Sequence, residues 1–66
     1  MKIRTITLTI DSELTVDQQQ TLSKNGCTII SATQISMPTY PDHAQCAWDE
    51  LSESTGYDVV SATWSD

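Results

Sequence analysis

Residues 2–10 read KIRTITLTI and alternate between apolar and polar side chains. Successive side chains of a strand point to opposite faces of a sheet, so this alternation indicates a strand whose two faces differ. The β-branched residues of the stretch favour the same conformation. We therefore predict a strand over residues 2–10 with one covered face and one open face. The covered face consists of Ile6, Leu8 and Ile10, and the open face of Thr5, Thr7 and Thr9.

A helix and a second strand are predicted to follow. Thr15 and Gln18 have the spacing of a capping box, in which two side chains satisfy backbone N–H groups at the start of a helix. Gly26 supplies a stop signal, so the helix is predicted over residues 15–24. The apolar and β-branched residues after it predict a strand over residues 27–36.

A second helix and a third strand complete the pattern. Asp42 and Gln45 repeat the capping-box spacing ahead of a helix that we predict over residues 43–55. Gly56 ends this helix, and residues 57–64 are predicted to form the third strand. Apolar residues at positions i, i+3, i+4 and i+7 mark the side of the helix that faces a core. This stripe consists of Ala44, Ala47, Trp48 and Leu51.

The chain also contains an apparent repeat. Residues 22–33 align with residues 51–63 with one insertion, and each segment holds a helix end, a glycine and a strand. The predicted fold is therefore a single small two-layer domain over residues 1–66, of α/β or α+β class. It has the order β-α-β-α-β, with two helices on one face of a three-stranded sheet. Short right-handed crossovers would make the strands parallel; a split arrangement with one antiparallel strand is the alternative, and the strand order stays open.

The charge is distributed unevenly along the chain. All three Lys and Arg residues lie in the first 24 positions, whereas residues 25–66 contain six acids and no Lys or Arg. The net charge of −6 therefore belongs to the second part of the chain. Phosphate groups and anionic membrane surfaces attract cations, so direct binding to nucleic acid or to a membrane is disfavoured.

Cysteine usage and the N-terminal pattern predict a cytoplasmic protein. Cys27 and Cys46 are too few for a disulfide framework and have no Cys-x-x-Cys spacing, so we expect two reduced thiols. The alternating N-terminus differs from the unbroken apolar run of a signal peptide, and no apolar run is long enough to span a membrane.

The residues that carry chemistry do not form a catalytic pattern. His43 is the only histidine, and Cys46, three positions along the same predicted helix, points to a different side. Asp42, Cys46 and Glu50 recur at i, i+4 and i+8, but helical metal sites usually add histidine and a second element. We therefore expect no enzyme, no cofactor and no metal site.

The predicted second helix carries an acidic face. Asp49, Glu50 and Glu53 share one side of it, and no Lys or Arg stands at i±3 or i±4 to neutralise them. Such a face either keeps the protein soluble or docks on a basic protein, because complementary charge speeds encounter and selects partners. The predicted partner-binding residues are Asp42, Asp49, Glu50, Glu53, Asp58 and Trp64, the last as an exposed aromatic anchor.

These acids, together with Asp66, make the chain similar in kind to small phage-encoded anti-defence proteins such as anti-CRISPRs and DNA mimics. The resemblance rests on length and acidity and includes no shared motif. It implies an inhibitor or adaptor that covers a basic, nucleic-acid-binding surface of a host or defence protein. The alternative is a self-associating structural module that uses the open sheet face or an edge strand. We also predict a homodimer or larger assembly, because a 66-residue chain has a small core.

Overall fold

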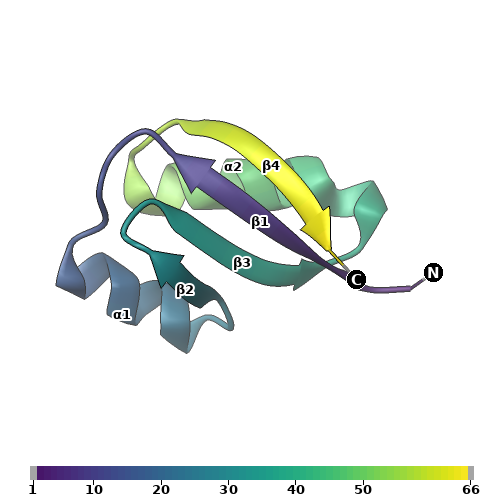
Figure 1. The fold of residues 1–66 in the computed structure, drawn as a ribbon, viewed down its shortest axis with the longest axis horizontal. Coiled ribbons are helices and arrows are strands. Elements are labelled where there is room, and N and C mark those ends of the chain that lie inside the picture. Colours follow the sequence, from purple (N-terminus) through teal and green to yellow (C-terminus); the bar gives the residue numbers. More distant parts are fainter. Residues whose placement is uncertain (1, 66) are drawn as a thin grey trace.

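The computed structural model describes residues 2–65, so Met1 and the acid Asp66 lie outside the described residues. This part of the chain forms four strands and two α-helices, so its fold is of class α+β. Figure 1 shows their arrangement. In chain order the elements are β1 (Arg4–Ile10), α1 (Val16–Lys24), β2 (Thr28–Ser31), β3 (Gln34–Thr39), the short 3-10 helix η1 (Pro41–His43), α2 (Ala44–Thr55) and β4 (Val59–Ser65).

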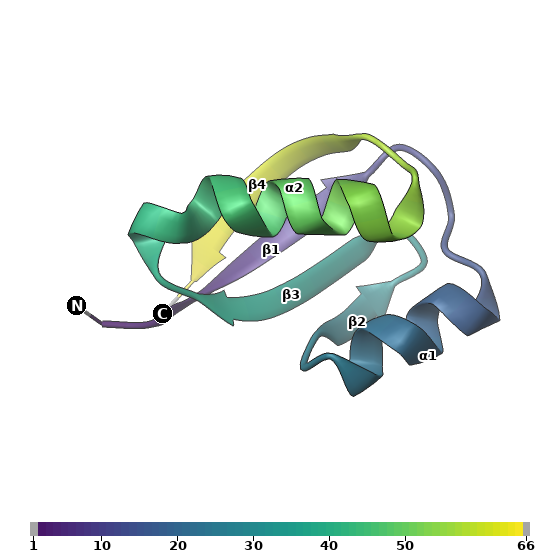
Figure 2. The same ribbon diagram turned by 180° about the vertical axis from the view of Figure 1, so that it is seen from behind.

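The four strands form one antiparallel sheet in the order β2-β3-β1-β4. The alternation of β1 sets its two faces, as predicted. Ile6 stands between Met37 of β3 and Trp64 of β4, and this apolar face is covered by both helices. Figure 2, seen from behind, shows α1 and α2 on the same side of the sheet. The molecule therefore has two layers.

The prediction of three strands in a β-α-β-α-β order is wrong, because residues 27–36 do not form one strand. They contain β2, a turn at Ala32 and Thr33, and the start of β3. The Ser31 hydroxyl accepts a bond from the Thr33 N–H at 3.3 Å. The Ile10 N–H donates to the Thr33 carbonyl at 2.9 Å, and the Leu14 N–H donates to the Ala32 carbonyl at 2.7 Å. The turn is thus held by residues distant in sequence, and no strand pairs in parallel.

The two segments of the apparent repeat share only two structural features, a glycine after a helix and a strand after that glycine. Gly26 and Gly56 both have positive φ, 91° and 76°, and each follows a helix. The matching Ser-Ala-Thr segments differ, because residues 31–33 form the hairpin turn whereas residues 61–63 lie inside β4. The two halves are therefore not equivalent structural units.

The start of α1 follows the prediction closely. The Gln18 N–H donates to the Thr15 hydroxyl at 3.1 Å, and the Thr15 N–H donates to the Gln18 side-chain oxygen at 3.0 Å, which completes the capping box. The amide group of Gln18 also donates to the Thr55 carbonyl at 3.2 Å. This contact ties the start of α1 to the end of α2.

The predicted capping box of the second helix does not form. Pro41 begins the 3-10 turn η1, and His43 occupies the cap position of α2 without a side-chain hydrogen bond. Gln45 donates instead to the carboxylate of Asp49 at 3.0 Å. A 3-10 turn that leads directly into α2 takes the place of the cap, so Asp42 has no capping role.

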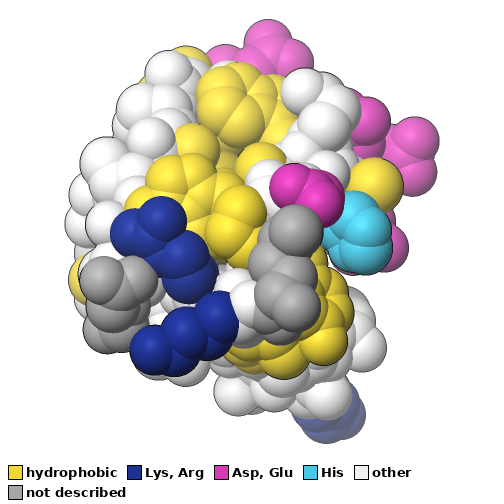
Figure 3. All heavy atoms as spheres, turned by 90° about the vertical axis from the view of Figure 1, so that its right-hand side faces the viewer, with side chains coloured by type: hydrophobic (Ala, Val, Ile, Leu, Met, Phe, Trp, Pro, Cys, Tyr) yellow, Lys and Arg dark blue, Asp and Glu magenta, His cyan; other side chains and the backbone are white. Residues whose placement is uncertain are grey.

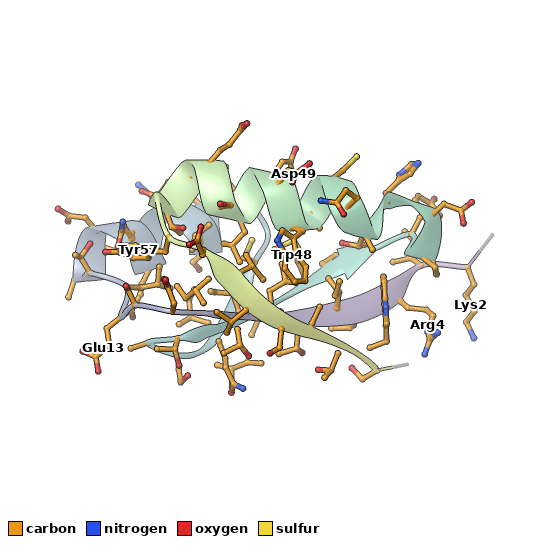
Figure 4. The ribbon with its side chains drawn as sticks, turned by 90° about the horizontal axis from the view of Figure 1, so that it is seen from above. Lys2, Arg4, Glu13, Trp48, Asp49 and Tyr57 are labelled. Atoms are coloured by element: carbon orange, nitrogen blue, oxygen red, sulfur yellow. The ribbon has the colours of Figure 1, made fainter. Side chains whose placement is uncertain are left out.

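The core lies between the sheet and the helices. Leu51, from the predicted stripe, is 2% exposed, but Trp48 is only half-buried and packs against the margin of the core. The stripe therefore faces the sheet, with Trp48 at its margin on the side of β4 (Figure 4). The fully covered members of the core are Ile6, Leu8, Ile10, Leu14, Leu22, Ile35, Ala47, Leu51 and Val59.

The other sheet face carries hydroxyl side chains. Neither helix of the described residues covers it (Figure 1). Thr7 lies between Ser36 of β3 and Thr63 of β4, and the side chain of Gln34 donates to the Thr9 hydroxyl at 3.4 Å. Thr5, Thr7 and Thr9 are half-buried by these neighbours. The open face predicted from the threonines is therefore present.

Candidate functional site

A groove of about 660 Å³ runs beside α2, on the side away from β4. Its walls come from α2, the end of α1, the approach to β2 and the end of β3, elements that Figure 2 labels. The groove exists because α1 packs beside β2, at the far edge of the sheet from β4, and leaves the flank of α2 uncovered.

The floor of the groove is apolar. Leu22 from α1 and Ala47 and Leu51 from α2 are buried, and Cys27 and Met37 are half-buried between them. These five side chains come from three elements and the residue ahead of β2, so they meet only in the folded chain. A floor of this kind favours an apolar side chain of a ligand, because binding removes apolar surface from water.

The rim of the groove is acidic and aromatic. Glu50 and Glu53 line it from α2, and neither Lys nor Arg is among the lining residues. Tyr40 and His43 line the end near η1, where their rings meet edge to face with centroids 5.9 Å apart. All four of these side chains are exposed. The rim therefore offers negative charge and an aromatic surface to whatever enters.

Glu50 acts across the groove on the thiol of Cys27. Burial raises the pKa of Cys27 above its ordinary value of 9.0, and the negative charge of Glu50 raises this pKa further. The Cys27 thiol is therefore protonated at neutral pH. Both residues line the groove, with the Cys27 thiol in its floor and the Glu50 carboxylate on its rim.

The residues predicted to bind a partner do not form one surface. Glu50 and Glu53 line the groove, whereas Asp49 is exposed on the outer side of α2 and bonded to Gln45. The remaining three lie elsewhere. Asp42 is in η1, Asp58 directly precedes β4, and Trp64 is near the end of β4.

Trp64 is half-buried rather than exposed. Its side chain packs against the core from the helix-covered face, and the guanidinium carbon of Arg4 lies 5.6 Å from the centre of its ring. Such a cation–π contact holds both side chains in place. Trp64, expected to be the more exposed of the two tryptophans, is half-buried like Trp48, because it lies opposite Ile6 on the apolar face of the sheet.

Sequence reasoning missed the groove residues outside α2. Leu22, Cys27, Met37 and Tyr40 are far apart in the chain and share no spacing pattern. The signal that bears on them is the connector Pro38–Pro41, whose prolines restrict the backbone around Tyr40. Even this signal does not reveal what Tyr40 faces.

Within residues 2–65, no three His, Cys, Asp or Glu side chains are grouped so as to hold a metal ion. In the same part of the chain, neither helix has the length and apolar character needed to cross a bilayer. Comparison with known proteins finds no matching family model, no matching curated protein and no matching solved structure.

Proposed function

We propose that this chain is a small acidic protein-binding module that takes a basic, partly apolar segment of a partner protein into the groove beside α2. One observation carries the proposal: an apolar floor is bordered by carboxylates that no lining Lys or Arg neutralises. Of the predicted acidic face, this proposal assigns partner binding only to the two residues that line the groove, Glu50 and Glu53.

The two parts of the groove have separate roles in this proposal. The carboxylates attract a cationic segment over a distance and reject acidic ones, which raises the association rate and the specificity. The floor around Leu51 and Met37 supplies affinity, because a buried apolar contact at the centre of an interface excludes water. A segment that alternates Lys or Arg with large apolar residues satisfies both.

An inhibitory role follows from the same chemistry. Positively charged grooves with interleaved aromatic side chains are common where proteins bind single-stranded nucleic acid. A module that occupies such a surface would compete with the nucleic acid for it, so we propose inhibition of a nucleic-acid-binding partner as the biological outcome. An adaptor role would use the same groove without that competition.

The proposal is tested by titrating the 15N-labelled protein with a synthetic peptide of lysine and leucine, followed by NMR. A peptide with glutamate in place of lysine is the control. We expect the lysine peptide alone to shift the amide signals of Cys27, Met37 and Ala47. Affinity should fall as ionic strength rises past about 0.15 M, where the screening length is about 8 Å.

Two neighbouring residues of α2 provide the matched variants. Glu50→Gln removes a charge from the groove rim, and Asp49→Asn removes the same charge one residue away, outside the groove. We expect Glu50→Gln to weaken the peptide and Asp49→Asn to leave its affinity within about twofold, a difference of about 0.4 kcal/mol. Equal losses in the two variants would contradict a groove site and indicate a diffuse charge effect.

A further inference from the structure

Strand β4 is an unprotected edge of the sheet. It stands last in the strand order, so half of its backbone N–H and C=O groups point away from β1. Natural edge strands are usually short, charged, interrupted by proline or covered. β4 has seven residues, VVSATWS, none of which is charged or a proline. The opposite edge, β2, has four residues and lies beside α1.

The side chains along this edge are apolar on the helix side. Ala62 is exposed although it stands opposite the buried Leu8, and Val60, at the irregularity before the regular part of the strand, is 59% exposed. Trp48 and Trp64 are half-buried beside them. Figure 3 looks onto the end of the molecule that carries Lys2 and Arg4 and shows hydrophobic side chains gathered next to these cations.

We infer that β4 pairs antiparallel with β4 of a second copy of this chain, about a two-fold axis at Thr63, to give one continuous eight-stranded sheet. The regular part of β4 is Ser61–Ser65, because the register with β1 shifts between Ser61 and Val59. Thr63 is the centre of that part. The axis places Ser61 opposite Ser65 and Ala62 opposite Trp64 of the second copy.

The side chains fit this register. The small side chain of Ala62 leaves room for the ring of Trp64 from the second copy. Because of the two-fold axis, this Ala62–Trp64 contact occurs twice in the interface. Thr63 meets its own counterpart on the hydroxyl face, where Thr–Thr pairs across strands are favourable. The interface thereby covers apolar surface that a single copy leaves open.

Charge complementarity favours a second copy of the chain as the occupant. Lys2 and Arg4 lie at the end of the sheet where β4 ends, and Glu13 and Tyr57 lie at the other end (Figure 4). Asp11 and Asp58 are joined there by a backbone bond of 3.0 Å. An antiparallel pair therefore sets the acidic end of each copy beside the basic end of the other.

The register brings these charges to the same level. Thr5 faces Ser65, so Lys2 lies at the level three residues beyond Ser65. With the axis at Thr63, Asp58 of the second copy lies at the same height along the strands as Lys2. The register shift near Val59 changes this height by at most one residue. The two backbones are then two strand spacings apart, about 10 Å, which long side chains can bridge.

The acidic groove does not oppose this pairing. It lies on the side of α2 away from β4, and the side of α2 nearest β4 carries the uncharged Trp48. Two copies joined at β4 therefore keep both grooves open and far apart. The inference is independent of the proposed function, because each uses a different flank of α2.

The oligomeric state is tested by sedimentation velocity of the full chain over a range of concentrations. A one-strand interface is small, so we expect a dimer that dissociates on dilution. Ala62→Lys puts a long cationic side chain where the ring of Trp64 and the guanidinium of Arg4 of the other copy would lie, at both contacts, and should give a monomer at every concentration. Ile30→Lys is the matched control, because Ile30 is 53% exposed on the other edge strand. A wild-type monomer throughout, or loss of the dimer in the control alone, overturns the inference.

Cysteine cross-linking tests the register. In a background of Cys27→Ser and Cys46→Ser, Thr63→Cys places two thiols on the two-fold axis, where the Cα atoms of facing residues are about 4.5–5.5 Å apart. Copper phenanthroline as oxidant should convert this variant to a disulfide dimer. Ser61→Cys should remain monomeric on denaturing gels, since its counterpart is four residues away along the pair. A cross-link at residue 61 and none at residue 63 overturns the proposed axis.

Discussion

Cys27 and Cys46 both line the groove, yet their thiols lie in different environments. Cys27 is half-buried in the floor of the groove, whereas Cys46 is exposed on α2. Only a thiolate reacts with alkylating reagents, so a raised pKa slows the reaction at a given pH. The environment of each thiol therefore determines its reactivity.

We predict that iodoacetamide at pH 8 modifies Cys46 much faster than Cys27. In the single-thiol variant Cys46→Ser, the rate at Cys27 should keep rising with pH above 9, because its pKa is raised. Adding Glu50→Gln should shift that profile to lower pH, while burial keeps it above the ordinary value. Adding Asp49→Asn instead should leave the profile unchanged. A faster reaction at Cys27 than at Cys46 would contradict the assignment.

Leu51 and Trp48 belong to the same apolar stripe but differ in burial. Leu51 is 2% exposed and Trp48 is half-buried. Leu51→Ala should lower the free energy of unfolding by about 3 kcal/mol, since it leaves a cavity in the core. Trp48→Ala should cost at least about 3 kcal/mol as well, because the large ring packs against the core even though part of its surface is in water. Urea denaturation followed by circular dichroism measures both, and a loss well below about 1 kcal/mol for Trp48→Ala would contradict its packing against the core.

At the scale of elements, the end of α2 depends on a backbone conformation. Gly56 has φ 76°, and its N–H donates to the Ser52 carbonyl at 2.8 Å. A Cβ added there would meet no atom within 4 Å, so Gly56→Ala should be penalised only by the left-handed backbone. We expect a loss of about 1 kcal/mol in thermal or urea unfolding.

Gly56→Asn provides the comparison for that experiment. Asparagine tolerates the left-handed conformation better than alanine, so its loss should be the smaller of the two. An equal loss in both variants would indicate that the side chain, and not the backbone, is rejected at this position.

Local signals were sufficient for α1 and for the faces of β1. The capping box of Thr15 and Gln18 involves residues three apart, and the alternation of β1 is visible in the sequence itself. The hairpin was missed because its turn at Ala32 and Thr33 contains no glycine and has no residue with positive φ. Bonds from Ile10 and Leu14 hold it, and the sequence pattern does not contain such distant contacts.

The same distinction applies to the candidate site. Glu50 and Glu53 were predicted, since helical spacing places them on one side of α2. Their separation from Asp49 could not be predicted, because it depends on which flank of the helix the sheet leaves uncovered. The floor was missed for a similar reason, since Leu22 and Met37 meet α2 only in the folded chain.

For the molecule as a whole, its size makes the net charge of −6 sensitive to salt. The longest dimension is 34 Å, comparable with the screening length of about 30 Å at 0.01 M ionic strength. At 0.15 M that length falls to about 8 Å, and repulsion between distant carboxylates is largely screened. The folded state should therefore gain stability over this range.

We predict that the urea midpoint rises between 0.01 M and 0.15 M sodium chloride, while affinity for the lysine peptide falls. Salt weakens the repulsion between carboxylates within the chain, which raises the urea midpoint. Salt also weakens the attraction between the carboxylates and the lysine peptide, which lowers the affinity. Glu53→Lys should reduce the salt dependence of both measurements. The substitution replaces a negative charge on the groove side of α2 by a positive one and so makes the net charge less negative by two units. A midpoint that falls with salt would contradict a repulsive net charge.

The position of β1 in the sheet has a consequence for how the chain acquires its structure during synthesis. β1 is synthesised before both of its neighbours, β3 and β4, which come much later in the chain. Until residues 59–65 have left the ribosome, β1 exposes Ile6, Leu8 and Ile10 without the strand that flanks them on that side. Pairings between distant segments form slowly, and unpaired apolar strands attract chaperones and other nascent chains. β1, an interior strand of the finished sheet, is therefore without its second neighbouring strand until β4 has been synthesised.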